Sequence, residues 1–280
     1  MNYKIVGDSC CDVTMAMREK YNIALAPLSL NLDGVEYIDD DSLDLDDYLA
    51  KIDASPNVPK TACPSISDYM MHFEGEHEYT IVVTISSELS GSYNSAMNAK
   101  EMFMEENPGK KVHVVDSRGA SSGQVLIALK AIELFEAGIE FDDVVKALET
   151  YRDKQKVLFV LEKIDTLEKN GRMSKMKAKI VRALNLKLIL KADQNGVIDL
   201  TDKARGMNKA LKKMVLSMEK VGELDDDTTI IISHVKALER AEYVKKLIED
   251  TYVHYKEIII IETKGLSSTY ANKGGIIMAF

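Results

Sequence analysis

Short apolar runs alternate with segments of helical periodicity through residues 1–150. The runs have the length of buried strands, and the segments between and after them repeat apolar residues at helical spacing. The expected strands are Lys4–Gly7, Tyr79–Ile85 and Val112–Val115. The expected helices are Thr14–Tyr21, Ser65–Phe73, Tyr93–Glu106, Ser121–Ala137, which Gly138 should terminate, and Phe141–Lys154. This order of strands and helices favours a parallel or mixed sheet covered by helices.

The same alternation continues through residues 151–280. The expected strands are Val157–Leu161, Leu188–Lys191, Thr229–His234 and Glu257–Glu262. The expected helices are Gly206–Val221, Leu238–Tyr252 and a shorter one over Ser174–Asn185. Between Lys187–Ala192 and Val197–Leu200, the Asn195-Gly196 pair predicts a hairpin turn.

This pattern predicts an α/β fold made of two lobes, residues 1–150 and 151–280, with a cleft between them. The charge distribution supports the boundary. Residues 1–150 contain 11 Lys and Arg against 27 Asp and Glu, whereas residues 151–280 contain 25 against 18. The net charge of −9 argues against general binding to nucleic acid.

Other features indicate a cytoplasmic protein. No run of about twenty apolar residues could span a membrane. The N-terminal residues lack the apolar stretch and cleavage site of a signal peptide. Cys10, Cys11 and Cys63 suit a reducing compartment, and their spacing does not indicate a zinc site. We expect them to be small packing residues.

An acidic segment, Asp39–Asp47, resembles a calcium-binding loop in composition. It lacks the spaced glycine and the closing bidentate glutamate that such a loop requires. A helix that begins after Ser42 or Asp44, with further carboxylates in its first turn, explains the segment more simply. We therefore expect no metal ion here.

Two hydroxyl-rich turns are the strongest candidates for chemistry. The first is Thr61–Ser65, and the second, Ser86–Ala96, directly follows an expected strand. Hydroxyls and backbone N–H groups at such positions bind anions. They also cap helices, with Thr61 or Ser65 beginning one helix and Ser90 or Ser92 the next. The two roles are compatible, because a capped helix still directs N–H groups outward.

Catalytic motifs are absent. The chain contains neither the phosphate-binding motif of nucleotide hydrolases nor a dinucleotide fingerprint, and it has no Gly-x-Ser-x-Gly sequence. His234 stands at the end of a strand, where a structural hydrogen bond is the simplest role. A hydrolase that uses Ser90 remains the weakest alternative, and binding an anion without transforming it is favoured.

Five motifs, in order along nearly the whole chain, resemble the DegV family. They are Asp8-Ser9 with Asp12, then Lys60-Thr61-x-x-Pro64-Ser65, then Ser86-Ser87-x-Leu89-Ser90-Gly91-x-Tyr93-x-Ser95-Ala96, then Val114-Val115-Asp116-Ser117, and Gly171-Arg172-Met173-Ser174-Lys175. The resemblance implies a non-enzymatic, two-lobed α/β protein without cofactor that encloses a long-chain fatty acid. It also implies that Thr61 and Ser90 hold the carboxylate.

Some members of the family present the fatty acid to a separate ATP-dependent kinase, which forms an acyl-phosphate. In those members an arginine that matches Arg172 and a histidine near the C-terminus are linked to the transfer. Tyr270 stands at the place of that histidine here. A tyrosine phenol titrates near pH 10 in peptides, so it does not replace imidazole in proton transfer near neutral pH. The resemblance therefore implies binding, and it leaves partnership with a kinase as the alternative.

The basic stretch Lys169–Lys191 has two interpretations. A solvated helix face accounts for its charge most simply. It could also form a docking surface for an acidic partner or for transient contact with an anionic membrane.

Overall fold

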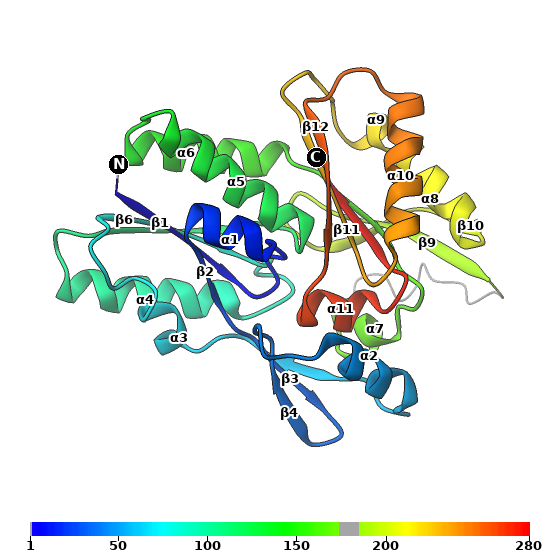
Figure 1. Cartoon of the computed structure of the whole chain (residues 1–280), viewed down its shortest axis with the longest axis horizontal. Helices are drawn as coiled ribbons and strands as arrows, with labels where there is room; N and C mark the ends of the chain where they lie inside the picture. Colours follow the sequence, from blue (N-terminus) through cyan, green and yellow to red (C-terminus); the bar gives the residue numbers. More distant parts are fainter. Residues whose placement is uncertain (1, 174–184) are drawn as a thin grey trace.

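A computed structural model gives the fold and describes residues 2–173 and 185–280 (Figure 1). The expected helix Ser174–Asn185 falls almost entirely outside these residues. A four-stranded sheet has the order β2-β1-β6-β7, and all its pairings are parallel. Its strands are β1 (Tyr3–Asp8), β2 (Ile23–Ala26), β6 (Tyr79–Thr84) and β7 (Lys111–Asp116).

Helices cover both faces of this sheet because its strands are apolar on both sides. Successive side chains point to opposite faces, so Ile81 and Val83 contact one apolar cluster and Val82 another. Figure 1 shows helices on either side of the sheet. These are α1 (Met15–Tyr21), α5 (Ser122–Glu136) and α6 (Phe141–Lys154) on one side, and α3 (Ile66–Met70) and α4 (Ser92–Glu106) on the other.

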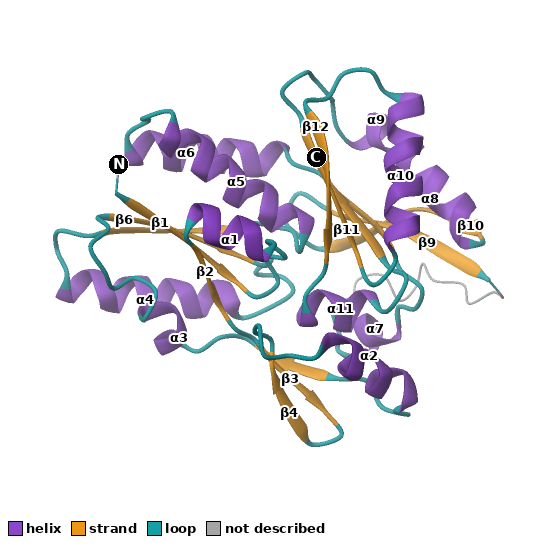
Figure 2. Ribbon diagram, viewed as in Figure 1, coloured by secondary structure: helices purple, strands orange, loops and turns teal. Residues whose placement is uncertain are grey.

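A six-stranded mixed sheet forms most of the second lobe. Its order is β10-β9-β8-β13-β11-β12, in which only the β11–β12 pairing is parallel. The strands are β8 (Val157–Val160), β9 (Leu186–Ala192), β10 (Ile198–Arg205), β11 (Thr229–His234), β12 (Glu257–Glu262) and β13 (Ile276–Ala279). The helices α8 (Met207–Leu216), α9 (Met218–Val221) and α10 (Leu238–Thr251) lie on its outer side (Figure 2).

Helix α5 joins the two sheets. It contacts β1 and β6 of the first sheet and β11 and β13 of the second. The whole of 122–128 is buried, because both sides of this part of the helix face protein. Gly138 adopts a left-handed conformation (φ 77°) just after the helix, as its expected role as a terminator requires. We propose that the lobes are 1–150 and 151–280, a boundary that falls near the end of α6.

A small third sheet was not expected from the sequence. It consists of β3 (Ser29–Leu32), β4 (Val35–Ile38) and β5 (Lys60–Ala62), in the antiparallel order β4-β3-β5. Helix α2 (Leu45–Ala54) lies beside it, at the lower edge of Figure 1. Asp44 caps α2 by accepting the N–H of Asp47 at 3.0 Å, which confirms the capping interpretation of the acidic segment.

The prediction of a single helix over Gly206–Val221 is wrong. The helix breaks at Ser217, where α8 ends and α9 begins. The Ser217 hydroxyl donates to the carbonyl of Lys213 at 2.8 Å, four residues earlier, and this contact competes with the backbone ladder. None of the helices in the described part of the chain is long and apolar enough to cross a bilayer.

Candidate functional site

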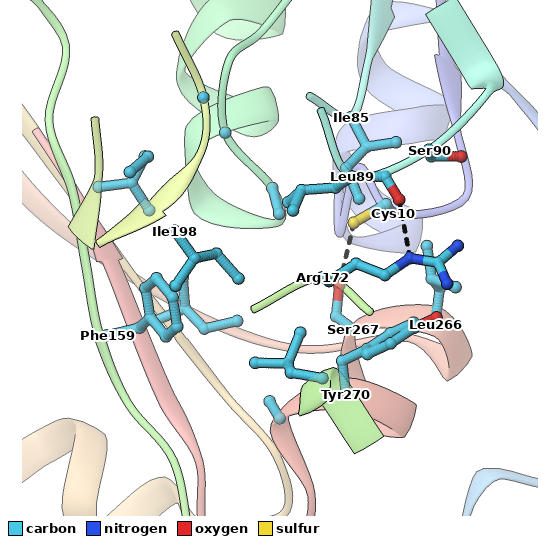
Figure 3. Close-up of a pocket in the computed structure, with 18 of the residues that line it drawn as sticks. Cys10, Ile85, Leu89, Ser90, Phe159, Arg172, Ile198, Leu266, Ser267 and Tyr270 are labelled. Atoms are coloured by element: carbon cyan, nitrogen blue, oxygen red, sulfur yellow. Dashed lines mark hydrogen bonds between the residues drawn. The ribbon is translucent and has the colours of Figure 1, made fainter. Parts of the chain in front are cut away.

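One cavity lies between the lobes, and all four residues singled out by the sequence line it. Thr61, Ser90, Arg172 and Tyr270 share this cavity, although they come from four separate segments. Figure 3 shows the last three of them. Its empty volume, part of which opens to solvent, is about 800 Å³.

The cavity lies at the carboxyl edge of the four-stranded sheet. Strand β1 is followed on one side of the sheet by β2 and on the other by β6, so the chain reverses its winding between β1 and β6. Ligands bind at such switch points in parallel sheets. Cys10 follows β1 there, and Ile85, Leu89 and Ser90 follow β6.

The opposite wall of the cavity is apolar. It comes from the six-stranded sheet, whose inner side presents Val157, Phe159, Ile198 and Ile277. In Figure 3 Phe159 and Ile198 lie on one side of the cavity, and Ser90, Arg172 and Tyr270 on the other. The cavity therefore has a polar end and a hydrocarbon end.

Thr61 lies on strand β5, where its backbone pairs with Leu30 of β3. The sequence offers Thr61 or Ser65 as the residue that begins the next helix. Ser65 has that role, because its Oγ accepts the N–H of Asp68 at 3.2 Å while the Asp68 carboxylate accepts the N–H of Ser65 at 2.7 Å. Thr61 is left free of capping, and its Oγ1 lies 2.9 Å from the Tyr270 hydroxyl.

Ser90 combines a local structural contact with a place in the cavity. Its Oγ accepts the N–H of Ser92 at 3.2 Å and lies 3.1 Å from the Ser92 hydroxyl. These contacts stabilise the turn before α4. Gly91 is the residue that directly precedes this helix. Ser90 thus stabilises this turn and lines the cavity, whereas the expectation that Ser90 or Ser92 caps α4 is wrong, because the cap residue is Gly91.

Backbone carbonyls hold Arg172 at the polar end. Its Nε donates to the carbonyl of Leu89 at 3.1 Å, and one terminal nitrogen donates to that of Asn170 at 2.6 Å. Asn170 in turn donates to the carbonyl of Pro59 at 2.8 Å. These partners are neutral, so the contacts orient the guanidinium without compensating its positive charge.

Tyr270 belongs to helix α11 (Gly265–Ala271), which the sequence did not predict. Two buried carboxylates from the first lobe fix the start of this helix. Asp39 accepts the N–H groups of Gly265 and Leu266, both at 2.8 Å, and Asp12 accepts that of Lys264 at 2.6 Å. Asp39, which belongs to the acidic segment, therefore positions the wall of the cavity.

Burial raises the pKa of these carboxyl groups, although their hydrogen bonds oppose the shift. The pKa is raised to about 7 for Asp12 and to about 6 for Asp39. Asp8, at the end of β1, is also fully buried, and its pKa is raised to about 6. The hydrogen-bond partners are neutral N–H and O–H groups, and at Asp39 the nearby charge of Lys264 also lowers the pKa, but desolvation of the charged form is the larger effect.

The side chains at the polar end suit recognition of an anion better than hydrolysis. Of the described residues that line the cavity, none is a histidine or a carboxylate that could activate Ser90. His234 lies at the end of β11, where its Nδ1 accepts the N–H of Ala237 at 3.2 Å. Within the described ranges, no group of three His, Cys, Asp or Glu side chains could hold a metal ion.

Comparison of the sequence with protein families identifies one match. The profile of the DegV family, described as uncharacterised proteins, matches residues 2–280. A DegV domain-containing protein of Streptococcus pneumoniae R6 is 35% identical over 282 residues, an alignment that covers 100% of this chain and 99% of the relative.

Solved structures with the same fold contain fatty acids. A DegV family protein from Ruminococcus gnavus, refined with vaccenic acid, has a TM-score of 0.96 and 40% identity, with 100% of both chains covered. The S. pneumoniae fatty acid kinase (Fak) B3 protein, loaded with linoleic acid, has a TM-score of 0.90 and 34% identity, covering 100% of this chain and 99% of that one. A Eubacterium eligens protein loaded with heptadecanoic acid has a TM-score of 0.90 and 29% identity, covering 99% and 98%.

Proposed function

This chain belongs to the DegV family, and we propose that it binds a long-chain fatty acid in the cavity between its lobes. The observation that carries the proposal is the division of this cavity into a polar end and an apolar wall. A fatty acid has the same division, and the related structures named above contain such ligands. The protein acts as a carrier in lipid transport or fatty acid metabolism, without transforming its ligand.

Thr61 and Ser90 are the proposed hydrogen-bond donors to the carboxylate. Both side chains line the polar end, and each hydroxyl contacts another hydroxyl, so its proton can be redirected to a ligand. Arg172 and Tyr270 contribute a positive charge and a further hydroxyl at the same end. We place the carrier in the cytoplasm, where its free cysteines suit a reducing environment.

The hydrocarbon chain supplies most of the binding free energy. Burying about fifteen methylene groups at about 0.8 kcal/mol each gives an upper bound of about 12 kcal/mol. A hydrogen bond to a charged head contributes about 1.5–3 kcal/mol. The hydroxyls therefore determine orientation and head-group selectivity more than total affinity.

A second candidate function is presentation of the fatty acid to an ATP-dependent kinase. The similarity to the Fak B3 protein favours it, and Arg172 is the side chain proposed to contact the partner or the head group. Tyr270 distinguishes the candidates, since its phenol does not replace an imidazole in proton transfer near neutral pH. A simple carrier needs no such transfer.

Mass spectrometry of the protein after purification from bacteria and denaturation tests the proposed function. We expect a long-chain fatty acid in about one copy per protein. Native mass spectrometry of the same sample should give the combined mass. Absence of lipid, together with no binding of added palmitate or oleate, would refute fatty acid binding.

A further inference from the structure

A second cavity lies behind the hydrocarbon end of the first, and its lining differs in charge. The two cavities share Val157 and Ala192, which form the wall between them. The empty volume of the second is about 1070 Å³, part of which opens to solvent. It is bounded by the loop after β7, the end of α6, the end of β9 and helix α9, so both lobes contribute to it.

Basic side chains dominate this second cavity, which we call the basic pocket. Its charged lining residues are five cations and two carboxylates, in a chain whose net charge is −9. They are Arg118, Arg152, Lys156, Lys191 and Lys220, with Asp153 and Asp193. A concave site lined by one sign of charge concentrates ions of the opposite sign.

Internal contacts occupy both carboxylates. Asp153 accepts from Arg118 and from Nε of Arg152, each at 2.9 Å. Asp193 accepts the N–H groups of Asn195 and Val197, both at 2.9 Å, within the turn between β9 and β10. The carboxylates therefore make their hydrogen bonds to the arginines and within the turn, and neither forms an ion pair with a lysine of the pocket.

The three lysines form no ion pair within the described ranges, and the charges of Lys156 and Lys191 lie close enough to act on each other. The ammonium group of Lys156 has only a long contact, 3.4 Å, with the carbonyl of Gln155. Burial lowers the pKa of Lys156, the charge of Asp153 raises it, and the nearby charge of Lys191 lowers it further. Mutual repulsion of two amines in a concave site favours binding of an anion between them.

Arg118 is held rigidly at the edge of this pocket. Its backbone has φ 48°, a left-handed conformation that is costly for a residue with a side chain. The Arg118 N–H donates to Asp116 at 3.0 Å, and its guanidinium donates to the carbonyl of Gln194 at 3.1 Å. Part of the guanidinium remains available for a ligand, and an arginine presents paired donors that match phosphate oxygens.

We propose that the basic pocket binds a soluble phosphorylated small molecule that bridges the two lobes. A phosphate group carries about two negative charges at neutral pH and offers several acceptor oxygens. Three amines without an ion pair to a described residue and one fixed guanidinium, which come from separate elements, match that charge and geometry. This ligand is distinct from the fatty acid. Its binding would be a second function, in addition to the proposed binding of lipid.

Calorimetric titration of the full chain with inorganic phosphate and with ATP tests this proposal, with phosphatidylglycerol vesicles as a membrane comparison. The double variant Lys156→Ala/Lys191→Ala should bind phosphate or ATP at least about tenfold more weakly than the unaltered protein does. The matched double variant Lys209→Ala/Lys246→Ala, at exposed positions outside both cavities, should bind it like the unaltered protein. Binding should weaken with added salt.

Lipid content, measured in every variant, separates this proposal from the fatty acid proposal. The lysine variants should retain their fatty acid, since neither lysine lines the lipid cavity. The single variant Lys191→Gln serves if the double variant fails to fold. Absence of binding to both soluble probes, binding to vesicles alone, or equal affinity in the lysine variants would each overturn the proposal.

Discussion

The Thr61 hydroxyl lies 2.9 Å from the phenol oxygen of Tyr270, and 209 positions separate the two residues in sequence. This contact joins strand β5 of the small sheet to helix α11 at the polar end of the cavity. A fatty acid carboxylate would meet both hydroxyls there. Tyr270, which departs from the family pattern, therefore contacts Thr61, which we propose binds the carboxylate.

Replacement of both proposed donors, Thr61→Val with Ser90→Ala, should reduce selectivity for the charged head group. We expect the preference for a free fatty acid over its methyl ester to fall about tenfold or more, because hydrogen bonds to charged groups are lost. Competition binding measures this ratio. Thr201→Val is the control, since Thr201 lies outside the cavity. An unchanged ratio in the double variant would contradict the assignment.

The variant Tyr270→His tests the kinase alternative. An imidazole at this position restores a group that exchanges protons near neutral pH. With a fatty acid kinase from a related bacterium, formation of acyl-phosphate should be faster than with the unaltered chain. Tyr270→Phe is the matched control, because it keeps the ring and removes only the hydroxyl. If the histidine variant is no faster than the phenylalanine variant, Tyr270 does not limit transfer.

Asp39→Asn should destabilise the fold at pH 8. The carboxylate accepts from Ser9 as well as from the N–H groups of Gly265 and Leu266, and an amide has fewer acceptor sites for them. We expect the free energy of unfolding to fall by about 1–3 kcal/mol. Urea titration measures it, with the exposed Asp250→Asn as control. Equal stability of the two variants would show that Asp39 does not anchor α11.

Stability should depend on pH through the buried carboxyl groups. Folding raises the pKa of Asp8 to about 6, of Asp12 to about 7 and of Asp39 to about 6. Between about pH 4 and 7 these groups bind more protons in the folded than in the unfolded chain. Their contribution to the free energy of unfolding therefore decreases as pH rises through this window.

His72 and His234 act in the opposite direction, because burial lowers their pKa. Comparison with a variant isolates the contribution of the carboxyl groups. Unfolding by urea between pH 4 and 8 should show a less negative pH slope in Asp12→Asn than in the unaltered chain. Superimposable slopes would mean that Asp12 does not take up a proton in this range.

Gly196→Ala should disturb the contact between the lobes at the tip of the β9–β10 hairpin. A Cβ there would lie 2.3 Å from the Ser86 Oγ and 2.8 Å from the Arg118 Cα. Gly34→Ala is the matched control, since its φ of +85° resembles the +82° of Gly196 and nothing lies within 4 Å. Both variants should lose about 1 kcal/mol from backbone strain. Thermal unfolding should show a larger loss for Gly196→Ala, and equal losses would argue against a tight contact.

Patterns of apolar residues along the chain predicted the helices and strands in which buried positions recur at regular spacing. Helix α6 has the predicted limits, as do strands β11 and β12, because each has an uninterrupted helical or apolar pattern. Strands β3 to β5 are short, and β5 pairs with β3 from beyond helix α2, although β3 and β4 form a hairpin. Their few residues carry too little periodicity to separate them from loops. Helix α11 escaped prediction for another reason: Asp39 supplies its N-terminal acceptor from more than two hundred residues away.

The amino-acid sequence alone was enough to predict the alternation of strands and helices, the hydroxyl-rich turns and the resemblance to the DegV family. These features depend on residues close together in the chain, and therefore on local backbone preferences and motifs. Only the tertiary structure decided that Thr61, Ser90, Arg172 and Tyr270 line one cavity, and that buried carboxylates position its wall. Such contacts join segments far apart in sequence, and they form only when apolar burial brings the two lobes together.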